Sequence, residues 1–275
     1  MEYRTLENTD SACIYEAFTQ AFSDYQVSVD MPFKSFETML KRNGFMSAVS
    51  VGAFADRTLV GFILNGVREW DNKKTIYDLG TGVIPDFRRT GIMEGLLNLV
   101  RTICIENKIS VYQLEVIQDN EKALTLYKKQ GFRINRILNC YQLTDKIKEP
   151  GVYKVWKLEH PEKLQDDQWT VVKDFWTYPP SWQNAKDAVC AIAKSFSYTI
   201  VKFDGNLIGY GIVAVSYTHL RCSILVQNPY FAEVARRRTL KNALPPGSRR
   251  IGKAGTLTCR GGTSSLTGLL QFSHS

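Results

Sequence analysis

Apolar residues recur every three or four positions in four stretches of the first half of the chain, which is the spacing of a helix with one buried face. The predicted helices are residues 12–22, 33–46, 92–107 and 120–130. Between them lie shorter apolar runs bounded by turn residues, and these runs predict strands. The predicted strands are residues 47–55, 59–67, 75–84, 111–117, 133–138 and 140–143. This succession of helices and strands indicates an α/β (α+β) domain.

The second half of the chain partly repeats the first half at an offset of 148 positions. The matched pairs are Pro32 and Pro180, Asp56 and Asp204, Leu59 and Leu207, and Gly61 and Gly209. Four matches at one offset, in the same helix-then-hairpin order, favour a tandem duplication, although hairpins with a turn-Leu-x-Gly sequence also recur by chance. The match ends near Val215, where the second copy loses its periodicity. We therefore expect a second copy that is degenerate or truncated.

The net charge of +8 is carried by the end of the chain. Residues 217–275 contain nine basic side chains and one acidic side chain, which leaves 26 of each in residues 1–216. The neutral body argues against a nucleic-acid-binding face on the fold. Residues 245–275 are rich in Gly, Ser, Thr and Arg, a composition that cannot pack a core. We therefore expect a domain at 1–148, a partial second unit at 149–216, and a disordered or non-native tail at 217–275.

The remaining composition narrows the class of protein. With 44% hydrophobic residues the chain can bury a core, and it has no long apolar run that would span a membrane. The first residues lack the basic start and apolar run of a secretory signal. The six cysteines are scattered without a Cys-x-x-Cys pair, and there are only three histidines. We therefore expect a cytoplasmic protein without a metal site.

One stretch combines a strand end, a proline and a glycine directly before a long predicted helix. It reads Val83-Ile84-Pro85-Asp86-Phe87-Arg88-Arg89-Thr90-Gly91-Ile92-Met93. The unpaired N–H groups at the start of such a helix point to one place and can bind an anion such as a pyrophosphate. Gly91 lets the backbone approach a ligand closely, and the side chains of Arg88, Arg89 and Thr90 can add phosphate contacts. The alternative is an ordinary strand-to-helix turn with solvated arginines.

A second stretch places a polar residue, a small residue and a phenol on one face of a predicted helix. Asn120, Ala123 and Tyr127 lie at positions i, i+3 and i+7, so their side chains share that face. Such a face can line a narrow slot for an extended ligand. The alternative is that Asn120 only caps the helix and that Tyr127 is a core aromatic residue.

Taken in order, the two stretches resemble the GNAT superfamily of acetyl-CoA-dependent N-acetyltransferases. The family's coenzyme A turn, Val-x-Pro-x-x-(Arg/Gln)-x-x-Gly-x-(Gly/Ala), is matched at Val83, Pro85, Arg88 and Gly91, and Met93 departs from it at the last position. The family's second block, Asn-x-x-Ala-x-x-Leu-Tyr-x-x-x-Gly-Phe, is matched at Asn120, Ala123, Leu126, Tyr127, Gly131 and Phe132. The resemblance spans about residues 1–145.

The resemblance implies a mixed, mostly antiparallel sheet flanked by helices, with acetyl-CoA as co-substrate and direct attack by a primary amine in a ternary complex. The residues it implies for coenzyme binding are Val83, Ile84, Arg88, Arg89, Thr90, Gly91, Ile92, Met93, Asn120 and Ala123. It further implies that a backbone N–H near Val83 or Ile84 stabilises the oxyanion and that Tyr127 protonates the departing thiolate. Glu115 and Asp78 are candidates for the base, with a structural role as the alternative for each.

Two other classes of protein remain open at this point. The chain could be a non-catalytic protein that binds or senses acyl-CoA, or a nucleic-acid-binding protein that relies on its basic tail. We expect no membrane partner, and the neutral body makes a nucleic-acid partner a weak expectation. The sequence does not identify the amine acceptor, and it allows a homodimer.

Overall fold

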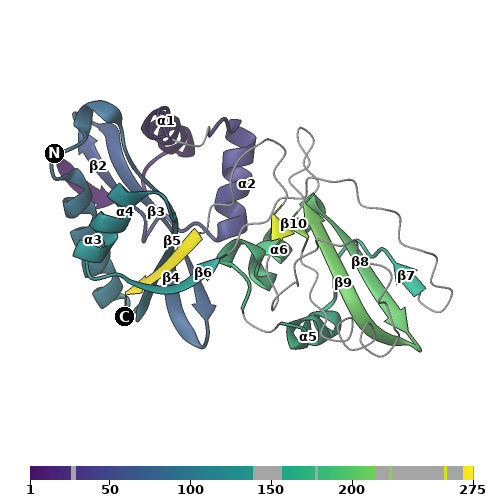
Figure 1. Cartoon of the computed structure of the whole chain (residues 1–275). Coiled ribbons are helices and arrows are strands. Elements are labelled where there is room, and N and C mark those ends of the chain that lie inside the picture. Colours follow the sequence, from purple (N-terminus) through teal and green to yellow (C-terminus); the bar gives the residue numbers. More distant parts are fainter. Residues whose placement is uncertain are drawn as a thin grey trace, which may run out of the picture. The chain divides into compact units, whose positions relative to one another are not determined.

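The computed structural model describes residues 1–25, 29–138, 157–176 and 179–214, together with the backbone of three short strands closer to the C-terminus. The chain forms two compact units, one made of Met1–Ile137 and Leu269–Ser275 and the other of Leu138–Gly268. Figure 1 shows the helices and strands of both units. The domain boundary expected at residue 148 lies outside the described residues.

The first unit is built on a sheet of seven strands in the order β1-β2-β3-β4-β5-β12-β6. The strands are β1 (Glu2–Thr5), β2 (Val51–Ala55), β3 (Thr58–Trp70), β4 (Lys73–Val83), β5 (Val111–Ile117), β6 (Arg133–Leu138) and β12 (Leu269–His274). Neighbours from β1 to β4 pair antiparallel, as do β5 and β12, whereas β4 and β5 pair parallel. The prediction of a mixed, mostly antiparallel sheet is therefore confirmed. Strand β1 was not predicted from the sequence.

Four helices cover the two faces of this sheet. They are α1 (Ser11–Ala21), α2 (Phe33–Asn43), α3 (Ile92–Glu106) and α4 (Glu121–Lys129). Helices α1 and α2 lie on one face, and α3 and α4 lie on the other (Figure 1). The apolar stripe predicted for α3 is buried at Leu96, Leu97, Val100 and Ile103, and it joins one core cluster with the sheet. The helical periodicity of the sequence therefore identified the faces that pack.

The second unit repeats the opening of the first on a smaller scale. Its sheet has the order β7-β8-β9, with β7 (Lys157–Glu159), β8 (Phe196–Phe203) and β9 (Asn206–Ala214) all antiparallel. Helices α5 (Asp166–Asp174) and α6 (Lys186–Ala191) lie between β7 and β8 in the chain. A separate core cluster includes Trp169, Val172 and Ile200. The order of strand, two helices and hairpin is that of β1, α1, α2, β2 and β3.

Three short strands fall in the region for which the sequence indicated no regular structure. They are β10 (Ser223–Ile224), β11 (Leu257–Thr258) and β12. Strand β12 has the sequence Leu-Leu-Gln-Phe-Ser-His and pairs along its whole length with β5. A six-residue pairing of this kind was not anticipated from the composition of the tail. The strand expected at residues 140–143 lies outside the described residues.

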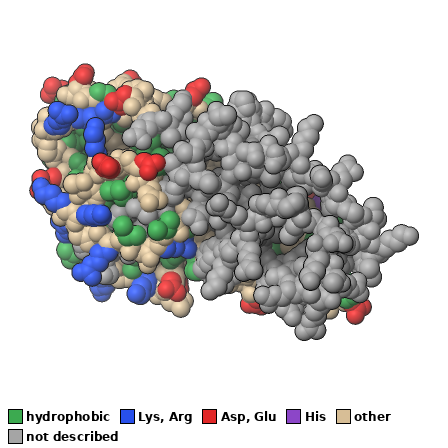
Figure 2. Space-filling view, in the orientation of Figure 1, with side chains coloured by type: hydrophobic (Ala, Val, Ile, Leu, Met, Phe, Trp, Pro, Cys, Tyr) green, Lys and Arg blue, Asp and Glu red, His purple; other side chains and the backbone are tan. Residues whose placement is uncertain are grey.

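The described surface carries both signs of charge. Figure 2 shows Lys and Arg side chains among Asp and Glu side chains on the visible face of the first unit, rather than in one block. This agrees with the equal numbers of basic and acidic residues in residues 1–216. In the described part of the chain, no helix is both long enough and apolar enough to cross a membrane.

Candidate active site

Strands β4 and β5 run side by side for a few residues and then part. Their parallel pairing joins residues 75–77 to residues 111–113, whereas β4 continues to Val83 and β5 to Ile117. Beyond Tyr77, the backbone groups on the edge of β4 that faces β5 have no partner in the ladder between these two strands. A ligand that contains amide groups can pair with a strand edge of this kind.

The chain turns from β4 into α3 directly at the end of this edge. Ile84 N–H donates to the Val60 carbonyl at 3.0 Å, and Pro85–Phe87 form a single 3-10 turn. Gly91 is the N-cap of α3 with a left-handed backbone (φ 82°), and it offers no side-chain cap to the helix. The first N–H groups of α3 therefore have no intrahelical partner. A Cβ atom added at Gly91 would meet no atom within 4 Å, so the space beside the turn is open.

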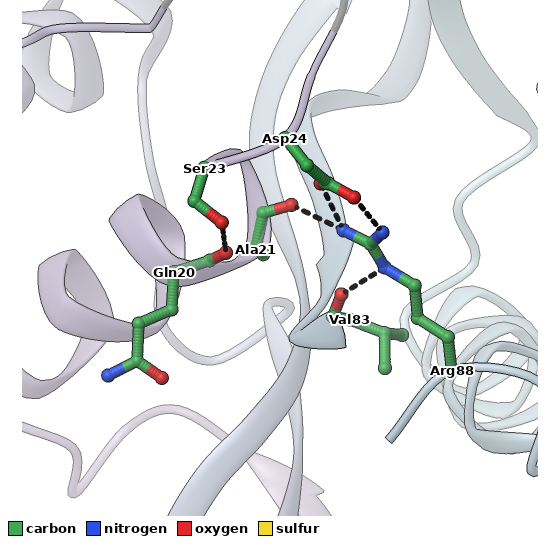
Figure 3. A network of polar contacts seen from close by, with 6 residues as sticks. All are labelled: Gln20, Ala21, Ser23, Asp24, Val83 and Arg88. Carbon is green, nitrogen blue, oxygen red and sulfur yellow. Dashed lines mark hydrogen bonds and ion pairs between the residues drawn. The ribbon is translucent and has the colours of Figure 1, made fainter. Parts of the chain in front are cut away.

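The guanidinium of Arg88 is held by four contacts within the first unit (Figure 3). Its Nε donates to the Val83 carbonyl and its Nη2 to the Ala21 carbonyl, both at 3.0 Å. Nη1 and Nη2 also contact the two oxygens of Asp24 at 2.6 and 2.8 Å. Arginine has five N–H donors, so one remains for a ligand. The phosphate contact expected of Arg88 stays a prediction, and the structure gives this side chain a second task, which is to join the end of β4 to the end of α1.

The ion pair between Arg88 and Asp24 also changes the titration of both groups. The hydrogen bond from Arg88 lowers the pKa of Asp24, and the carboxylate in turn raises the pKa of Arg88. Both side chains are substantially exposed, at 38% and 57%. An ion pair in water contributes little to stability by itself. Its effect is therefore geometric, because it fixes where the turn lies relative to α1.

The remaining side chains of the turn differ in what they can offer an anion. The Thr90 hydroxyl donates to the Phe87 carbonyl at 2.6 Å, so its proton is already engaged. Arg89 is exposed and has a left-handed backbone (φ 64°). Ile92 is 3% exposed and Met93 packs against the same core. These last two residues can therefore contribute only their backbone N–H groups.

Asp78 and Tyr127, which the sequence offered as a base and an acid, are in direct contact. Asp78 lies on β4 beside a bulge in which Leu79 is the extra residue, since Leu64 pairs with Gly80 and Asn65 with Asp78. Its Oδ1 accepts the Gly80 N–H at 2.8 Å. Its Oδ2 accepts the Thr81 hydroxyl at 2.6 Å and the Tyr127 hydroxyl at 3.3 Å. Tyr127 reaches this point from α4 and is 5% exposed.

Burial controls the titration of this pair. It raises the pKa of Asp78 to about 6, although hydrogen bonds from Thr81, Gly80 and Tyr127 act in the opposite direction. The pKa of Tyr127 is raised well above its usual value. Burial is the largest cause, and the nearby charge of Asp78 is the second. Near neutral pH the pair therefore consists of a carboxyl group poised to exchange a proton and a phenol that keeps its own.

Asn120 and Ala123 open the helix that carries Tyr127. The Oδ1 of Asn120 accepts the Ala123 N–H at 3.2 Å, which is the N-cap interaction of α4. The Nδ2 of Asn120 is 3.5 Å from the Tyr25 hydroxyl. The capping role named as an alternative is thus present in the structure, and contact of these residues with a coenzyme stays a prediction.

Glu115 does not join the other two candidate catalytic residues. Side chains on a strand alternate between its two faces. On β5, Tyr112, Leu114 and Val116 share one face, and Tyr112 packs against Phe132, as does Tyr127 of α4, so Glu115 points to the opposite face of the sheet. The structure therefore brings together Asp78 and Tyr127 and places Glu115 on the side of α1 and α2.

The hydrogen bonds between β3 and β4 show which of the two proposed oxyanion donors, the Val83 N–H or the Ile84 N–H, is free of the β3–β4 ladder. The Ile84 N–H is already bonded to Val60. Val83, the residue before Ile84, lies opposite Gly61. Along an antiparallel pair, every second residue points its N–H away from the partner strand. The Val83 N–H therefore points away from β3, toward the edge from which β5 has parted. Val83 fits the role of donor, whereas Ile84 is engaged in the sheet.

Two cavities among the described residues lie away from these groups. One, of about 280 Å³, is lined by the C-terminal half of α3, the start of β5 and Phe132. The other, of about 430 Å³, lies beside α1 and the β2–β3 turn. Neither lining includes a residue predicted for the site. The candidate site is therefore built on a strand edge and a helix end, and neither of these two cavities belongs to it.

Two contacts within the candidate site were not predicted from the sequence, because Thr81 and Asp24, which make them, belong to no recognisable motif. Thr81 follows Asp78 by three residues and holds its carboxylate, and Asp24 comes shortly after α1 and holds Arg88. A Thr three residues after an Asp on a strand is a weak local signal. Nothing local links Asp24 to Arg88, which lies 64 positions away.

A comparison with known protein families assigns the first unit to a family. Residues 12–132 match the model of the acetyltransferase (GNAT) family. The first unit is therefore a domain of the GNAT acetyltransferase family, and the resemblance in its two motifs is confirmed. This match includes the turn before α3 and the block from Asn120 to Phe132, and it ends before the second unit.

Solved structures extend the likeness in fold to the rest of the chain. A tandem GNAT protein from the clavulanic acid biosynthesis pathway aligns with 99% of this chain and 98% of its own, at 12% identity and a TM-score of 0.63. A proposed acetyltransferase from Pyrococcus horikoshii aligns with 99% of this chain and 88% of its own, at 13% identity and a TM-score of 0.57. The ribosomal-protein-S18-alanine N-acetyltransferase from Escherichia coli aligns with 52% of this chain and 84% of its own, at 20% identity and a TM-score of 0.41. The first of these, the tandem GNAT protein, supports a tandem arrangement of the fold.

Proposed function

We propose that the first unit transfers an acetyl group from acetyl-CoA to a primary amine, by direct attack of the amine on the thioester in a ternary complex. The observation that carries the proposal is the parting of β4 and β5 next to a helix N-terminus that has an open glycine cap. This arrangement offers an unpaired strand edge for the amide groups of the coenzyme and N–H groups for its pyrophosphate. We further propose that residues 1–148 form the catalytic domain and residues 149–216 a partial second copy.

The turn supplies the anion site in this proposal. The backbone N–H groups of residues 89–94 face the pyrophosphate, and Gly91 lets it approach because no side chain stands there. Ile92 anchors the start of the helix in the core and holds these groups in place. Arg88 positions the turn through Asp24 and Val83, and its one remaining N–H is the donor that it can give to a phosphate.

The transfer step uses the groups where β4 and β5 part. The Val83 N–H donates to the oxyanion of the tetrahedral intermediate, and a preorganised donor of this kind is typically worth about 10²–10³ in kcat. Tyr127 gives a proton to the departing thiolate, and Asp78 is the base that we favour over Glu115. The contact between Asp78 and Tyr127 supports this choice, since Glu115 lies on the other face of the sheet.

A non-catalytic acyl-CoA-binding role is the second candidate, and one observation favours it. The hydroxyl of Tyr127 is buried and its pKa is raised, which makes the phenol a weak proton donor unless another group replenishes it. A protein that only binds acyl-CoA would not need this phenol to release its proton.

The location of the protein is also a proposal. Among the described residues, Cys13, Cys104 and Cys190 are free thiols. Free thiols without a disulfide support a reducing compartment, so we propose the cytoplasm.

A transfer screen with the full chain distinguishes the two candidate functions. Release of the coenzyme thiol from acetyl-CoA is followed in the presence of polyamines, amino acids, aminoglycosides and peptides with free N-termini. We expect at least one amine class to accelerate thiol release and to yield an acetylated product by mass spectrometry. Tight binding of acetyl-CoA with no amine-dependent release in any class would favour the binding protein instead.

A further inference from the structure

The Asp78 carboxylate is partly buried in the first unit, and the contacts that the described residues make with it come from hydroxyl and amide groups. Its three contacts are the Gly80 N–H, the Thr81 hydroxyl and the Tyr127 hydroxyl. Among the described residues no Lys, Arg or His forms an ion pair with it. A carboxylate in the interior that serves only stability is ordinarily paired with a cation or neutralised. This one is instead linked to a phenol across the point where the two strands part.

The titratable groups near Asp78 are the Tyr127 phenol of α4 and the Tyr112 phenol of β5. The Cys104 thiol of α3 lies next to Tyr112, and the Tyr25 phenol after α1 lies next to Tyr127. Burial raises the pKa of Tyr112, Tyr127 and Cys104, that of Cys104 to about 11. These three groups stay neutral near pH 6. Of the four groups, Asp78 is therefore the one that gains or loses a proton near that pH.

We propose that Asp78 and Tyr127 form one proton relay: Asp78 takes the proton that the attacking amine loses, and returns it to Tyr127 after Tyr127 has protonated the departing thiolate. This inference rests on the acetyl transfer proposed above. It goes beyond separate roles for an acid and a base, because it makes the second step depend on the first.

The reason is that a phenol has one proton and the Oδ2 of Asp78 competes for it. While Asp78 is ionised, the Tyr127 O–H is directed at Oδ2, 3.3 Å away. Once Asp78 is protonated, its own O–H donates to the Tyr127 oxygen, and the Tyr127 hydrogen is released toward another acceptor. The arrival of the amine proton at Asp78 thus turns Tyr127 into an available acid.

The step balances in atoms and charge. The amine nitrogen forms a bond to the thioester carbon, and the resulting cationic nitrogen gives a proton to Asp78. The carbon–sulfur bond then breaks, the electron pair leaves with sulfur, and the thiolate takes the Tyr127 proton. Asp78 passes its proton to the Tyr127 oxygen. The products are the acetamide and the free thiol, and both side chains are back in their starting states.

A double-mutant cycle on kcat tests the relay in the full chain. Asp78→Asn and Tyr127→Phe should each lower kcat by roughly 10²-fold or more, which is typical of acid–base assistance. The double variant should be no more than about threefold slower than the slower single variant, because either change interrupts the same relay. Tyr112→Phe is the matched control: it removes another buried phenol hydroxyl, bonded to Asn65 at 3.2 Å, and should keep kcat within about twofold.

The dependence of kcat on pH is a second test, which needs only the Tyr127→Phe variant. A purely structural role of Tyr127 would not shift this dependence. Asp78 must be ionised to accept the amine proton, so kcat of the parent should fall as the pH drops through about 6. The Tyr127 hydrogen bond lowers the pKa of Asp78, and its loss in Tyr127→Phe should move this limb to higher pH. Multiplicative losses in the cycle, or an unmoved limb, would overturn the relay while the transfer function stands. A parent chain that transfers acetyl to no amine would overturn both.

Discussion

The β2–β3 hairpin of the first unit and the β8–β9 hairpin of the second carry the same irregularity at equivalent positions. In the first, Val60 is the extra residue of a bulge, since Ala53 pairs with Gly61 and Phe54 with Leu59. In the second, Ile208 is the extra residue, since Val201 pairs with Gly209 and Lys202 with Leu207. Every one of these positions differs from its counterpart by 148, the offset of the sequence repeat.

The turns of the two hairpins agree as well. Asp56 and Arg57 have φ values of 47° and 70°, and Asp204 and Gly205 have values of 48° and 75°. Left-handed backbone at both central residues is the mark of a tight hairpin turn. A shared bulge and a shared turn are hard to reach by chance, so the structure supports the duplication that four matched residues indicated.

The sequence match between the two units ends just after the hairpin, near Val215. In the first unit the hairpin is followed by β4, the turn and α3, and Ile92 and Leu96 of α3 pack against Gly61 of the hairpin. The shared part is therefore scaffold, and the groups proposed for chemistry lie in the part that the repeat does not include. Matched variants in the two units test this division.

The largest expected effect comes from removing one phenol in each unit. Tyr127→Phe removes the proposed proton donor and keeps the ring, whose centroid is 5.5 Å from that of Phe132. We therefore expect kcat to fall by about 10²-fold with little change in coenzyme affinity. Tyr210→Phe removes a hydroxyl that accepts the Trp176 indole N–H at 2.8 Å in the second unit. It should reduce stability and leave kcat within about twofold. Equal losses of turnover in both variants would contradict the division.

A smaller effect is expected from the ion pair that holds the turn. Arg88→Lys keeps the charge but cannot make the forked contact and both carbonyl contacts. Asp24→Asn removes the carboxylate from the other side. If the pair positions the turn, each variant should weaken coenzyme binding by a few-fold, and the double variant no further.

The control for this prediction is the ion pair between Asp166 and Lys186 in the second unit, at 2.6 Å. Asp166→Asn should leave coenzyme affinity unchanged. A neutral result for Asp24→Asn together with a large loss for Arg88→Lys would instead make Arg88 a direct phosphate ligand. The pKa of Asp24 is lowered, so its contact with Arg88 should persist as the pH falls to the ordinary range of aspartate and be lost below it.

The smallest effect is expected from the tail. A chain ending at Val215 should keep its turnover, because the described contacts of the turn and of the Asp78–Tyr127 pair are made by residues 18–132. This truncation removes β12, the neighbour of β5. A second variant, in which only residues 269–274 are changed to Gly and Ser, isolates that strand. Loss of turnover in both would show that β12 is needed to complete the catalytic sheet.

Local features of the fold could be predicted from the sequence, whereas contacts between distant residues could not. Helix α2 ends at Gly44, a C-cap with a φ of 72° that glycine adopts readily, and the apolar stripe of α3 is buried as its spacing indicated. Both depend on residues within a few turns of each other. Strand β12 pairs with a partner more than 150 positions away, and no periodicity reports such a pairing.

The same distinction holds within the candidate site. The glycine turn before α3 is a local motif, and Gly91 has the left-handed backbone that only glycine adopts readily. The contact between Asp78 and Tyr127 joins residues 49 positions apart and depends on the bulge at Leu79. The sequence could therefore identify both residues but not show that they touch, nor that Glu115 faces away.

Calorimetry of acetyl-CoA binding to two matched glycine variants tests the central claim, that the coenzyme binds the turn of the first unit. Gly91→Glu and Gly205→Glu both place a carboxylate at a left-handed position with no atom within 4 Å, so they share the backbone strain and the open space. Only Gly91 lies where the pyrophosphate is proposed to approach, and repulsion between two charges a few ångströms apart at a protein surface is on the order of 4 kcal/mol before screening. We expect Gly91→Glu to weaken binding by at least tenfold and Gly205→Glu to leave it unchanged. Unchanged affinity in Gly91→Glu would contradict the placement of the coenzyme.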